Sequence, residues 1–268
     1  MNYAKSTFLL LATSLLFACN SSETNTTTQK ASIEKEVEEP IFTPTDFHLK
    51  SLDEDCENPE ECTHVVIDFS YPKDISEAEF AVVSDYFMKL TRNSFQAYSD
   101  SSMQDLQSLA DVFVMEFKQF KNEDSGDFNT APWYYEMKGN FNFQNEEWIS
   151  LELNEYSYTG GAHGNYQTII KTFNKADLKE LTFEDLTISE ISLAKKMEQA
   201  LRSQYGLSPE DDLGAAGFWF EDNTFQLNSN YAIRNDSLIF LYNPYEISSY
   251  AAGIIEIGVP LSQLGEVL

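Results

Sequence analysis

The apolar residues of this chain recur with two different periods, and those periods constrain its fold more than any other feature of the sequence. Three segments carry apolar residues at steps of three and four, which predicts helices with one buried face at about Ser76–Thr91, Ser101–Phe120 and Ser189–Tyr205. The segments between and after them alternate apolar with polar residues, which predicts strands with one solvated face. This order of elements indicates an α+β fold with antiparallel sheets, two N-terminal helices and one later helix, rather than a doubly wound β-α-β sheet.

Cap and turn residues predict where these elements end. Ser76 and Glu79 are spaced as a capping box at the start of the first helix, and Gly206 follows the third helix as a C-terminal cap. Turns are expected at Gly139-Asn140, Asn145-Glu146 and Asn235-Asp236. The expected strands are His64–Tyr71, Trp133–Lys138, a segment from Phe141 or Phe143, Trp148–Tyr158, Tyr166–Asn174, Thr224–Leu227, Ala232–Asn235, Leu238–Asn243 and Gly253–Val259.

Residues 1–18 have the features of an export signal. Lys5 supplies a positive charge, and the apolar stretch Thr7–Ala18 is too short for a bilayer span, which needs roughly 20 residues. Ala18 and Cys19 then follow the pattern of the bacterial lipobox, in which the cysteine carries a lipid after cleavage. We therefore predict a lipoprotein signal peptide, the alternative being an ordinary secretory signal with an incidental cysteine.

The lipid on Cys19 is the expected membrane anchor. Asn20 follows it in place of the aspartate that retains lipoproteins at an inner membrane, which favours an outer membrane. Residues 19–46 are rich in Ser, Thr and Glu, so we expect a flexible tether. Two α+β lobes follow, at residues 47–155 and 156–268, and they can share one sheet.

The remaining two cysteines lie close together in the segment CENPEEC. Cys56 and Cys62 form an even pair at short spacing in an exported chain, which predicts a disulfide. The alternative is a metal site completed by His64, although no second pair of ligands accompanies it. The acidic residues around the pair are expected to form a solvated surface, the alternative being a calcium site, although no Asp-x-Asp-x-Asp-Gly loop is present.

The charge of the chain limits its partners. It has 44 acidic and 17 basic residues, for a net charge of −27, so it has no basic footprint for a nucleic acid. A strongly negative surface attracts basic proteins at long range, although solubility or adaptation to salt also explains such a composition. The sequence has no Gly-x-x-x-x-Gly-Lys loop, and we expect neither a cofactor nor a metal.

Three stretches carry a family resemblance. They are YSYTGGAHG at Tyr156–Gly164, LTFEDL at Leu181–Leu186 and FQLNSNYAIRNDSLIFLYNPYEISSYAAGIIEIGVP at Phe225–Pro260. Their order and spacing resemble the extracytoplasmic domain of the lysozyme-sensing anti-sigma factor RsiV. The same domain, of unknown function in most members, is found beside the catalytic domain of PdaC-type peptidoglycan deacetylases. The resemblance covers about residues 45–268 and is strongest from residue 150 onward.

The sequence also departs from both kinds of relative. It lacks the sigma-binding segment and membrane-spanning helix of RsiV proteins, and its histidines at 48, 64 and 163 are too far apart for the paired-His motif of the deacetylases. The resemblance therefore implies the accessory module alone. It implies a noncatalytic binding or sensing module of the cell envelope, whose partner is a cationic, lysozyme-like protein or a cell-wall polymer such as peptidoglycan.

Candidate ligand contacts lie in two of the three stretches. Gly160 and Gly161 permit positive φ in the TGGAHG segment. The candidates are Tyr158, Gly160, Gly161, His163, Tyr245 and Glu246. The alternative is that TGGAHG is only a tight connection, with His163 bonded to a neighbour.

We assign no catalytic residue. Ser157 and His163 lack the GxSxG context of a nucleophile, and a carboxylate pair such as Glu152 and Glu155 is expected by chance in so acidic a chain. An enzyme acting on cell-wall sugars and a structural envelope lipoprotein remain the alternative functions.

Overall fold

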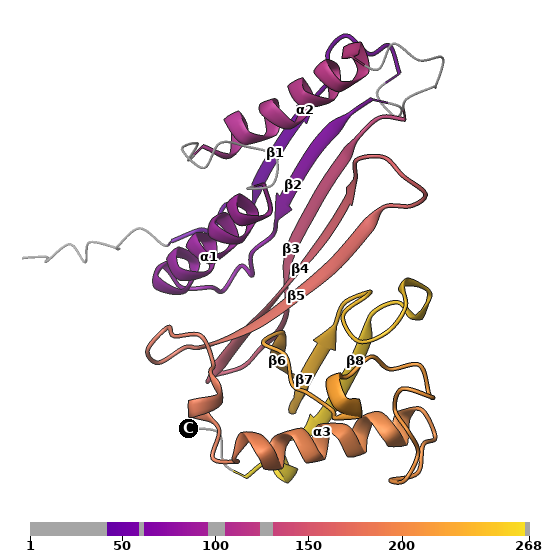
Figure 1. Ribbon diagram of the computed structural model, residues 1–268. Coiled ribbons are helices and arrows are strands. Elements are labelled where there is room, and N and C mark those ends of the chain that lie inside the picture. Colours follow the sequence, from indigo (N-terminus) through magenta and orange to yellow (C-terminus); the bar gives the residue numbers. More distant parts are fainter. Residues whose placement is uncertain (1–41, 59–61, 96–104, 124–130, 266–268) are drawn as a thin grey trace, which may run out of the picture. The chain divides into compact units, whose positions relative to one another are not determined.

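Figure 1 shows a computed structural model of the chain, which describes residues 42–58, 62–95, 105–123 and 131–265. Its helices and strands confirm the α+β fold. Their order is β1 (Phe47–Leu52), β2 (His64–Phe69), α1 (Glu77–Phe95), α2 (Leu106–Glu123), β3 (Tyr134–Gln144), β4 (Trp148–Tyr158), β5 (Asn165–Asn174), α3 (Glu190–Gln204), β6 (Tyr231–Arg234), β7 (Ser237–Tyr242) and β8 (Ile255–Pro260).

The strands form two sheets. One has five strands in the order β1-β2-β3-β4-β5, and the other has three in the order β6-β7-β8. All pairings are antiparallel except β2 with β3, which run parallel because α1 and α2 connect them. The expectation of purely antiparallel sheets is therefore corrected at this one pairing.

The five-stranded sheet has one apolar face and one polar face. Odd-numbered residues of its first four strands, among them Val65, Met137 and Leu151, pack against α1 and α2 in one buried cluster. Both helices lie on that side of the sheet (Figure 1). Because side chains alternate along a strand, the even-numbered residues project from the opposite side.

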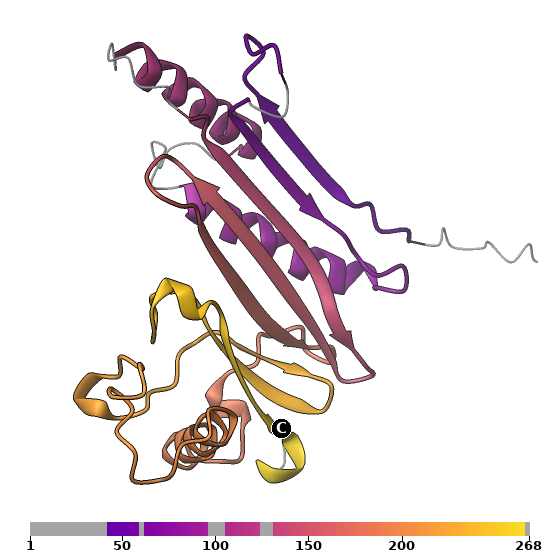
Figure 2. The same ribbon diagram turned by 90° about the vertical axis from the view of Figure 1, so that its right-hand side faces the viewer.

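The three-stranded sheet is sandwiched between α3 and β5. Leu193, Met197 and Leu201 of α3 belong to the same buried cluster as Leu238 and Phe240 of β7. On the other face of this sheet, Ala232, Ile239 and Leu241 pack with Ile170 of β5. Figure 2 shows β6–β8 beside the lower ends of β4 and β5. The even-numbered face of the large sheet is thus covered there by the second sheet.

Several cap and turn predictions are confirmed. The Glu79 carboxylate accepts a hydrogen bond from the backbone N–H of Ser76 at 2.7 Å, and the Ser76 hydroxyl accepts one from the N–H of Glu79 at 3.3 Å. Gly206 follows α3 with φ 67°. Asn235 and Asp236 make the turn between β6 and β7 with φ 48° and 60°.

Other predictions are wrong. Gly139-Asn140 is no turn, since β3 continues through both residues to Gln144. The glycine serves packing instead, because a Cβ at position 139 would lie 2.8 Å from the ring of Phe69. Residues 224–227 form no strand, and Asp222 and Asn223 before them adopt φ 51° and 56°. Residues 47–52, where no strand was expected, form β1.

The expected lobe boundary at residues 155–156 lies inside β4. The large sheet includes strands from both sides of that boundary, whereas the small sheet and α3 lie wholly after it. No helix of the described ranges is long and apolar enough to cross a bilayer. Cys19, the signal peptide and residues 19–41 of the expected tether lie outside the described residues.

Candidate functional site

The TGGAHG segment connects β4 to β5 as a tight loop built on its glycines. Gly160 and Gly161 adopt φ 104° and 96°, as their sequence predicts. Gly164 is required for a different reason, since a Cβ there would lie 2.4 Å from the hydroxyl oxygen of Tyr156. The Tyr158 hydroxyl donates a hydrogen bond to the carbonyl of Gly161 at 3.1 Å. These residues therefore shape the loop that presents His163.

The fold brings His163 together with two tyrosines of the distant segment NPYEISSY. The imidazole stacks on the ring of Tyr250 with centroids 4.0 Å apart, and Tyr245 lies 6.4 Å from His163 and 5.6 Å from Tyr250. Tyr166 of β5 meets Tyr250 edge-on at 5.5 Å. Four aromatic rings from three segments thus form one cluster, in which Tyr245 is 53% exposed.

The hydrogen bonds of His163 define its tautomer. Nδ1 lies 2.9 Å from the carbonyl oxygen of Gly164, and because a carbonyl can only accept, Nδ1 carries the proton. With the proton on Nδ1, Nε2 can accept a hydrogen bond from the Tyr245 hydroxyl at 3.4 Å. Both nitrogens are engaged, so neither is placed as a base on Ser157. His163 is thus hydrogen-bonded to neighbours, as the alternative interpretation of the sequence expected, and it has two partners.

A pocket of about 290 Å³ opens beside this cluster, at the edge of β5. It combines aromatic faces with a carboxylate and side-chain amides. The Glu155 carboxylate lies in its wall, where it accepts hydrogen bonds from Ser94 at 2.8 Å and Gln167 at 2.9 Å. The residues that matter for its chemistry are Glu155, Tyr166, Gln167, Asn243, Tyr245 and Tyr250.

Burial raises the pKa of Tyr250, and the neighbouring tyrosines Tyr166, Tyr156 and Tyr245 raise it further. Its hydroxyl therefore stays protonated and donates a hydrogen bond to the carbonyl of Gly164 at 2.8 Å. This bond fastens the segment around residue 250 to the TGGAHG loop.

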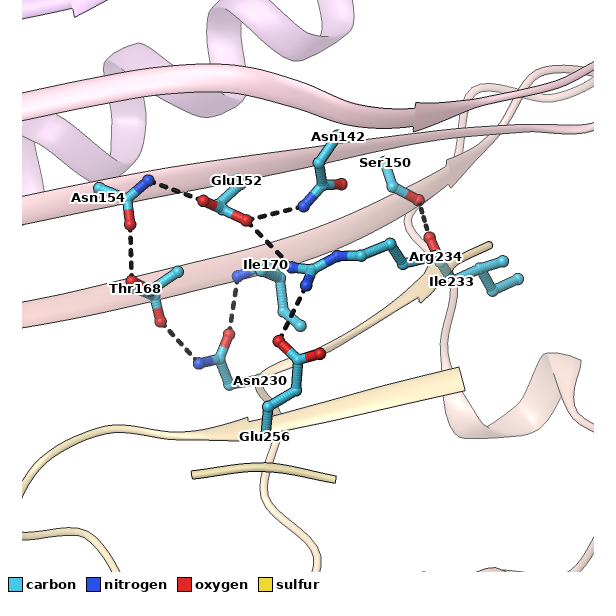
Figure 3. A network of polar contacts seen from close by, with 10 residues as sticks. All are labelled: Asn142, Ser150, Glu152, Asn154, Thr168, Ile170, Asn230, Ile233, Arg234 and Glu256. Atoms are coloured by element: carbon cyan, nitrogen blue, oxygen red, sulfur yellow. Dashed lines mark hydrogen bonds and ion pairs between the residues drawn. The ribbon is translucent and has the colours of Figure 1, made fainter. Parts of the chain in front are cut away.

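Two asparagine side chains hold the edge of β5 against the C-terminal segments. The Asn230 side-chain oxygen accepts from the backbone N–H of Ile170 at 2.8 Å, and its nitrogen donates to the carbonyl of Thr168 at 2.8 Å (Figure 3). The Asn243 side chain accepts from the N–H of Thr168 at 2.7 Å. The side-chain amides thus take the place of a neighbouring strand, and Asn243 begins the turn that carries Tyr245.

A charged cluster next to these amides joins the two sheets. Arg234 of β6 bridges the carboxylate of Glu152 at 3.0 Å and that of Glu256 at 2.9 Å, as Figure 3 shows. Glu152 also accepts from the amides of Asn142 and Asn154, each at 2.8 Å. Glu152 therefore stabilises the contact between the sheets.

Two acidic candidates have structural roles in place of chemical ones. Glu152 and Glu155 differ by three positions on β4, so they project from opposite faces of the sheet and do not form a catalytic pair. Glu246 accepts from the backbone N–H of Asn243 at 2.8 Å and from the Asn228 side chain at 2.6 Å. It stabilises its own turn and does not line the pocket.

The structure adds site residues that sequence reasoning missed. Tyr166 and Gln167 at the start of β5 line the pocket, and Asn243 positions its far wall. A tyrosine and a glutamine early in a predicted strand give no local signal of function. Their role becomes visible only in the structure, where β5 contacts the segment around residue 243. No local sequence pattern predicts that contact.

The N-terminal cysteine pair is bonded as predicted. Cys56 and Cys62 form a disulfide, which leaves no thiolate for the alternative metal site with His64. Lys118 of α2 makes ion pairs with Asp53 at 2.9 Å and Asp55 at 2.7 Å. Part of the acidic cluster thus fastens the disulfide segment to α2.

Comparison with known families agrees with the resemblance found in the sequence. Residues 179–262 match a family described as DUF3298, a protein of unknown function, and residues 56–166 match a family described as deacetylase PdaC. Together these matches make the chain similar to the DUF3298 family in its C-terminal part and to the PdaC family in its N-terminal part.

One curated relative and two solved structures are similar to this chain. The peptidoglycan-N-acetylmuramic acid deacetylase PdaC of Bacillus subtilis (strain 168) is 27% identical over 125 residues, which cover 45% of this chain and 26% of the relative. The chain thus spans about a quarter of that protein's length.

The two structures belong to the DUF3298 family. One, from Bacteroides fragilis NCTC 9343, has a TM-score of 0.65 and 18% identity over 84% of this chain and 92% of its own. The other, from Pseudomonas aeruginosa PAO1, has a TM-score of 0.59 and 20% identity over 84% and 93%. At these identities the likeness establishes the fold alone.

Proposed function

We propose that this chain is a noncatalytic binding module of the bacterial cell envelope, and that its pocket at the edge of β5 receives a cationic group of a partner protein. One observation carries this proposal. The TGGAHG loop and the NPYEISSY segment meet in one aromatic cluster, and the pocket beside it is lined by Tyr166, Tyr245, Tyr250 and Glu155.

These groups are suited to a lysine or arginine side chain. The faces of tyrosine rings attract cations, with about 0.5–2 kcal/mol for each well-placed contact, depending on how far the cation is desolvated. Glu155, which also lines the pocket, supplies the opposite charge. Tyr245 is exposed, so an incoming side chain can reach its ring without a rearrangement of the fold.

The net charge of −27 supports the same partner class. Long-range attraction accelerates the association of oppositely charged proteins and is screened beyond roughly 8–10 Å in physiological salt. The resemblance to the lysozyme-sensing domain of RsiV makes a lysozyme-like protein the first partner to test.

A cell-wall polymer is the second candidate ligand. It is favoured by the sequence match to the deacetylase of Bacillus subtilis, whose name specifies peptidoglycan as its substrate. Binding to the wall and binding to a basic protein are compatible, because a module near the wall meets the proteins that attack it.

A noncatalytic role is supported by how the polar residues of the site are used. His163 is bonded through both nitrogens, and Glu152 is bridged by Arg234. An enzyme acting on cell-wall sugars remains the competing function, and hydrolysis or deacetylation of purified peptidoglycan by the chain would establish it.

A lipid on Cys19 would hold this module at the membrane, with the segment to residue 46 as its tether. A tether of about 25 residues has an r.m.s. reach of roughly 25–30 Å, which keeps a folded domain clear of the membrane surface. We place the protein at the outer membrane on the basis of Asn20.

Surface plasmon resonance with hen-type lysozyme tests the proposal. The mature chain without its lipid is immobilised, and binding is measured for the wild type, Tyr245→Ala and the control Tyr205→Ala, whose ring is 45% exposed outside the pocket. We expect Tyr245→Ala to lower the affinity about tenfold and the control to leave it unchanged. The on-rate should fall steeply with salt while the off-rate changes less. Absence of binding at low salt would reject lysozyme as the partner.

A further inference from the structure

The outer edge of β5 is bonded by other segments of the chain along much of its length. β5 ends the strand order of the large sheet, so every second residue points its backbone N–H and C=O away from β4. On this side, the N–H groups of Thr168 and Ile170 donate to the side chains of Asn243 and Asn230 respectively. The carbonyl of Thr172 accepts from a backbone N–H at 2.8 Å. The outward backbone groups of β5 thus belong to its even-numbered residues.

Tyr166 continues this alternation two residues before Thr168. It pairs with Tyr156 of β4 in the same regular antiparallel register, so its N–H and C=O also point outward. Within the ranges that the structure describes, no residue bonds to either group. The C-terminal segment bonds the edge on both sides of Tyr166, at Thr168 and at Gly164. Tyr166 is therefore an open position between two occupied ones.

The pocket of about 290 Å³ lies at this open position, since Tyr166 and its neighbours Asn165 and Gln167 line it. Side chains alternate along a strand, so Tyr166 and Gln167 project to opposite faces of the sheet. The ring of Tyr166 contacts Tyr250 on one face. On the other face, Gln167 donates to the carboxylate of Glu155 at 2.9 Å. The pocket thus has tyrosine rings on one side of the strand edge and a carboxylate on the other.

An extended peptide segment matches this arrangement. A residue that faces an open edge residue exchanges two backbone hydrogen bonds with it, as in the addition of a strand to a sheet. Its side chain then lies on the same face as Tyr166, and the next side chain along the segment lies on the face of Glu155. Tyrosine rings and a carboxylate both attract cations. Two adjacent basic residues therefore complement the pocket better than one.

We infer that the pocket binds an extended segment of the partner with two adjacent basic residues, one of which pairs through its backbone with Tyr166. The inference rests on the proposed function, and it adds the conformation and the local sequence that the partner must present. Because the edge is already bonded at Thr168 and Gly164, the pairing involves one residue of the segment. An exposed turn or chain end of a basic protein can present such a residue.

Nuclear magnetic resonance of the ¹⁵N-labelled mature chain without its lipid tests the inference. The probe is a hexapeptide with two adjacent lysines between serine and threonine residues, blocked at both ends. We expect the amide proton of Tyr166 to move downfield during the titration and to exchange more slowly with water. Methylation of both lysine backbone nitrogens should weaken binding about tenfold or more, because the donor to Tyr166 is lost. The control peptide is methylated at its first residue and should keep its affinity.

Two substitutions at Tyr166 test the same backbone contact from the side of the protein. Tyr166→Ala removes the ring and keeps the N–H, whereas Tyr166→Pro removes both. Proline is tolerated on an edge strand where the missing N–H points outward, so the pairing of β5 with β4 is kept. We expect Tyr166→Pro to bind the peptide about fivefold or more weakly than Tyr166→Ala, and the control Tyr205→Ala to bind it as the wild type does.

The folding of each variant is checked by near-ultraviolet circular dichroism. If the proline variant does not fold, the methylated peptides decide the question on the wild type. Equal binding of the methylated and unmethylated peptides, or a Tyr166 amide that does not shift, overturns the inference. So does absence of peptide binding at about 50 mM salt, where electrostatic attraction is strong.

A peptide with one lysine replaced by serine tests the second basic residue. It should bind about threefold or more weakly, since one of the two cation contacts is lost, and unchanged affinity would contradict the requirement for two. The proposed function is judged separately. It stands if Tyr245→Ala weakens lysozyme binding while the peptide tests fail, and it fails together with the inference if neither lysozyme nor the peptide binds.

Discussion

The Tyr250 hydroxyl donates a 2.8 Å hydrogen bond to the carbonyl of Gly164, a residue 86 positions earlier in the chain. The ring of the same tyrosine stacks on His163. Two contacts of one side chain therefore fasten the C-terminal wall of the pocket to the TGGAHG loop. The C-terminal segment supplies Asn243, Tyr245 and Tyr250 to the pocket, so the pocket exists only when that segment is docked.

Substitutions at Tyr250 should separate these two contacts. Tyr250→Phe loses the hydrogen bond and keeps the stacked ring, so we expect a small fall in the urea midpoint and cation binding within about threefold of the wild type. Tyr250→Ala loses both contacts and one wall of the pocket, so lysozyme affinity should fall about tenfold or more. Equal effects of the two variants on affinity would contradict the role of the ring.

The helices could be located from the sequence. Each helix packs one side against a sheet, so its buried residues recur with the helical period. Phe87 of α1, Phe113 of α2 and Met197 of α3 lie in the buried clusters that these stripes predict. Prediction failed where a contact distant in the chain decides the conformation. Gly139 suggested a turn, yet the close approach of Phe69 makes it a strand residue.

The candidate site was predictable only in part, for the same reason. The motifs identified His163 and Tyr245, which the structure brings together. Tyr166 and Glu155 complete the pocket because β5 aligns with the segment around Asn243 through side-chain amides. No periodicity in the sequence specifies that alignment, so the pocket could not be assembled from local patterns.

The disulfide should contribute measurably to stability. Closing so short a loop stabilises a fold by about 2–2.5 kcal/mol through the entropy of the unfolded chain. We expect the double variant Cys56→Ala, Cys62→Ala to have a free energy of unfolding in urea about 2–2.5 kcal/mol lower than that of the wild type. Under reducing conditions, the wild type should be as stable as the double variant. Thiol labelling of the denatured, unreduced mature chain should modify neither residue, and labelling of both would disprove the bond.

Arg234 should be the main polar determinant of the contact between the sheets. Arg234→Ala leaves the partly buried carboxylate of Glu152 without its cation, which should cost about 2–3 kcal/mol of unfolding free energy. A lysine lacks the planar guanidinium that lets Arg234 contact Glu152 and Glu256 together. Arg234→Lys should therefore lose less stability than Arg234→Ala but remain less stable than the wild type. The exposed pair of Lys179 with Asp177 provides a control, and Lys179→Ala should leave the urea midpoint unchanged. An equal response of the two alanine variants would argue against a structural role for the bridge.

Cys19→Ser should abolish lipid attachment. We expect the variant to accumulate as precursor or soluble protein, and detergent phase partitioning of cell extracts measures this directly. The matched control is Cys56→Ser, which removes a cysteine without affecting the signal. Unchanged membrane retention of Cys19→Ser would refute the lipoprotein assignment.

The capping box at the start of α1 should make stability depend on pH. Burial alone raises the pKa of Glu79, but hydrogen bonds from Ser76 and the ion pair with Lys175 outweigh it, so the pKa lies below its ordinary value of 4.5. A carboxylate with a lowered pKa stabilises the fold fully above its ordinary pKa, and this contribution is lost as pH falls through the lowered one. Glu79→Gln should therefore be less stable than the wild type by about 1–3 kcal/mol at pH 7, and the difference should shrink below pH 4.5. Urea unfolding of the wild type and Glu79→Gln at a series of pH values measures this difference in stability. The control is Glu77→Gln, at an exposed position of the same helix. If the stability difference between the wild type and Glu79→Gln does not depend on pH, the charge of Glu79 is not what stabilises the helix.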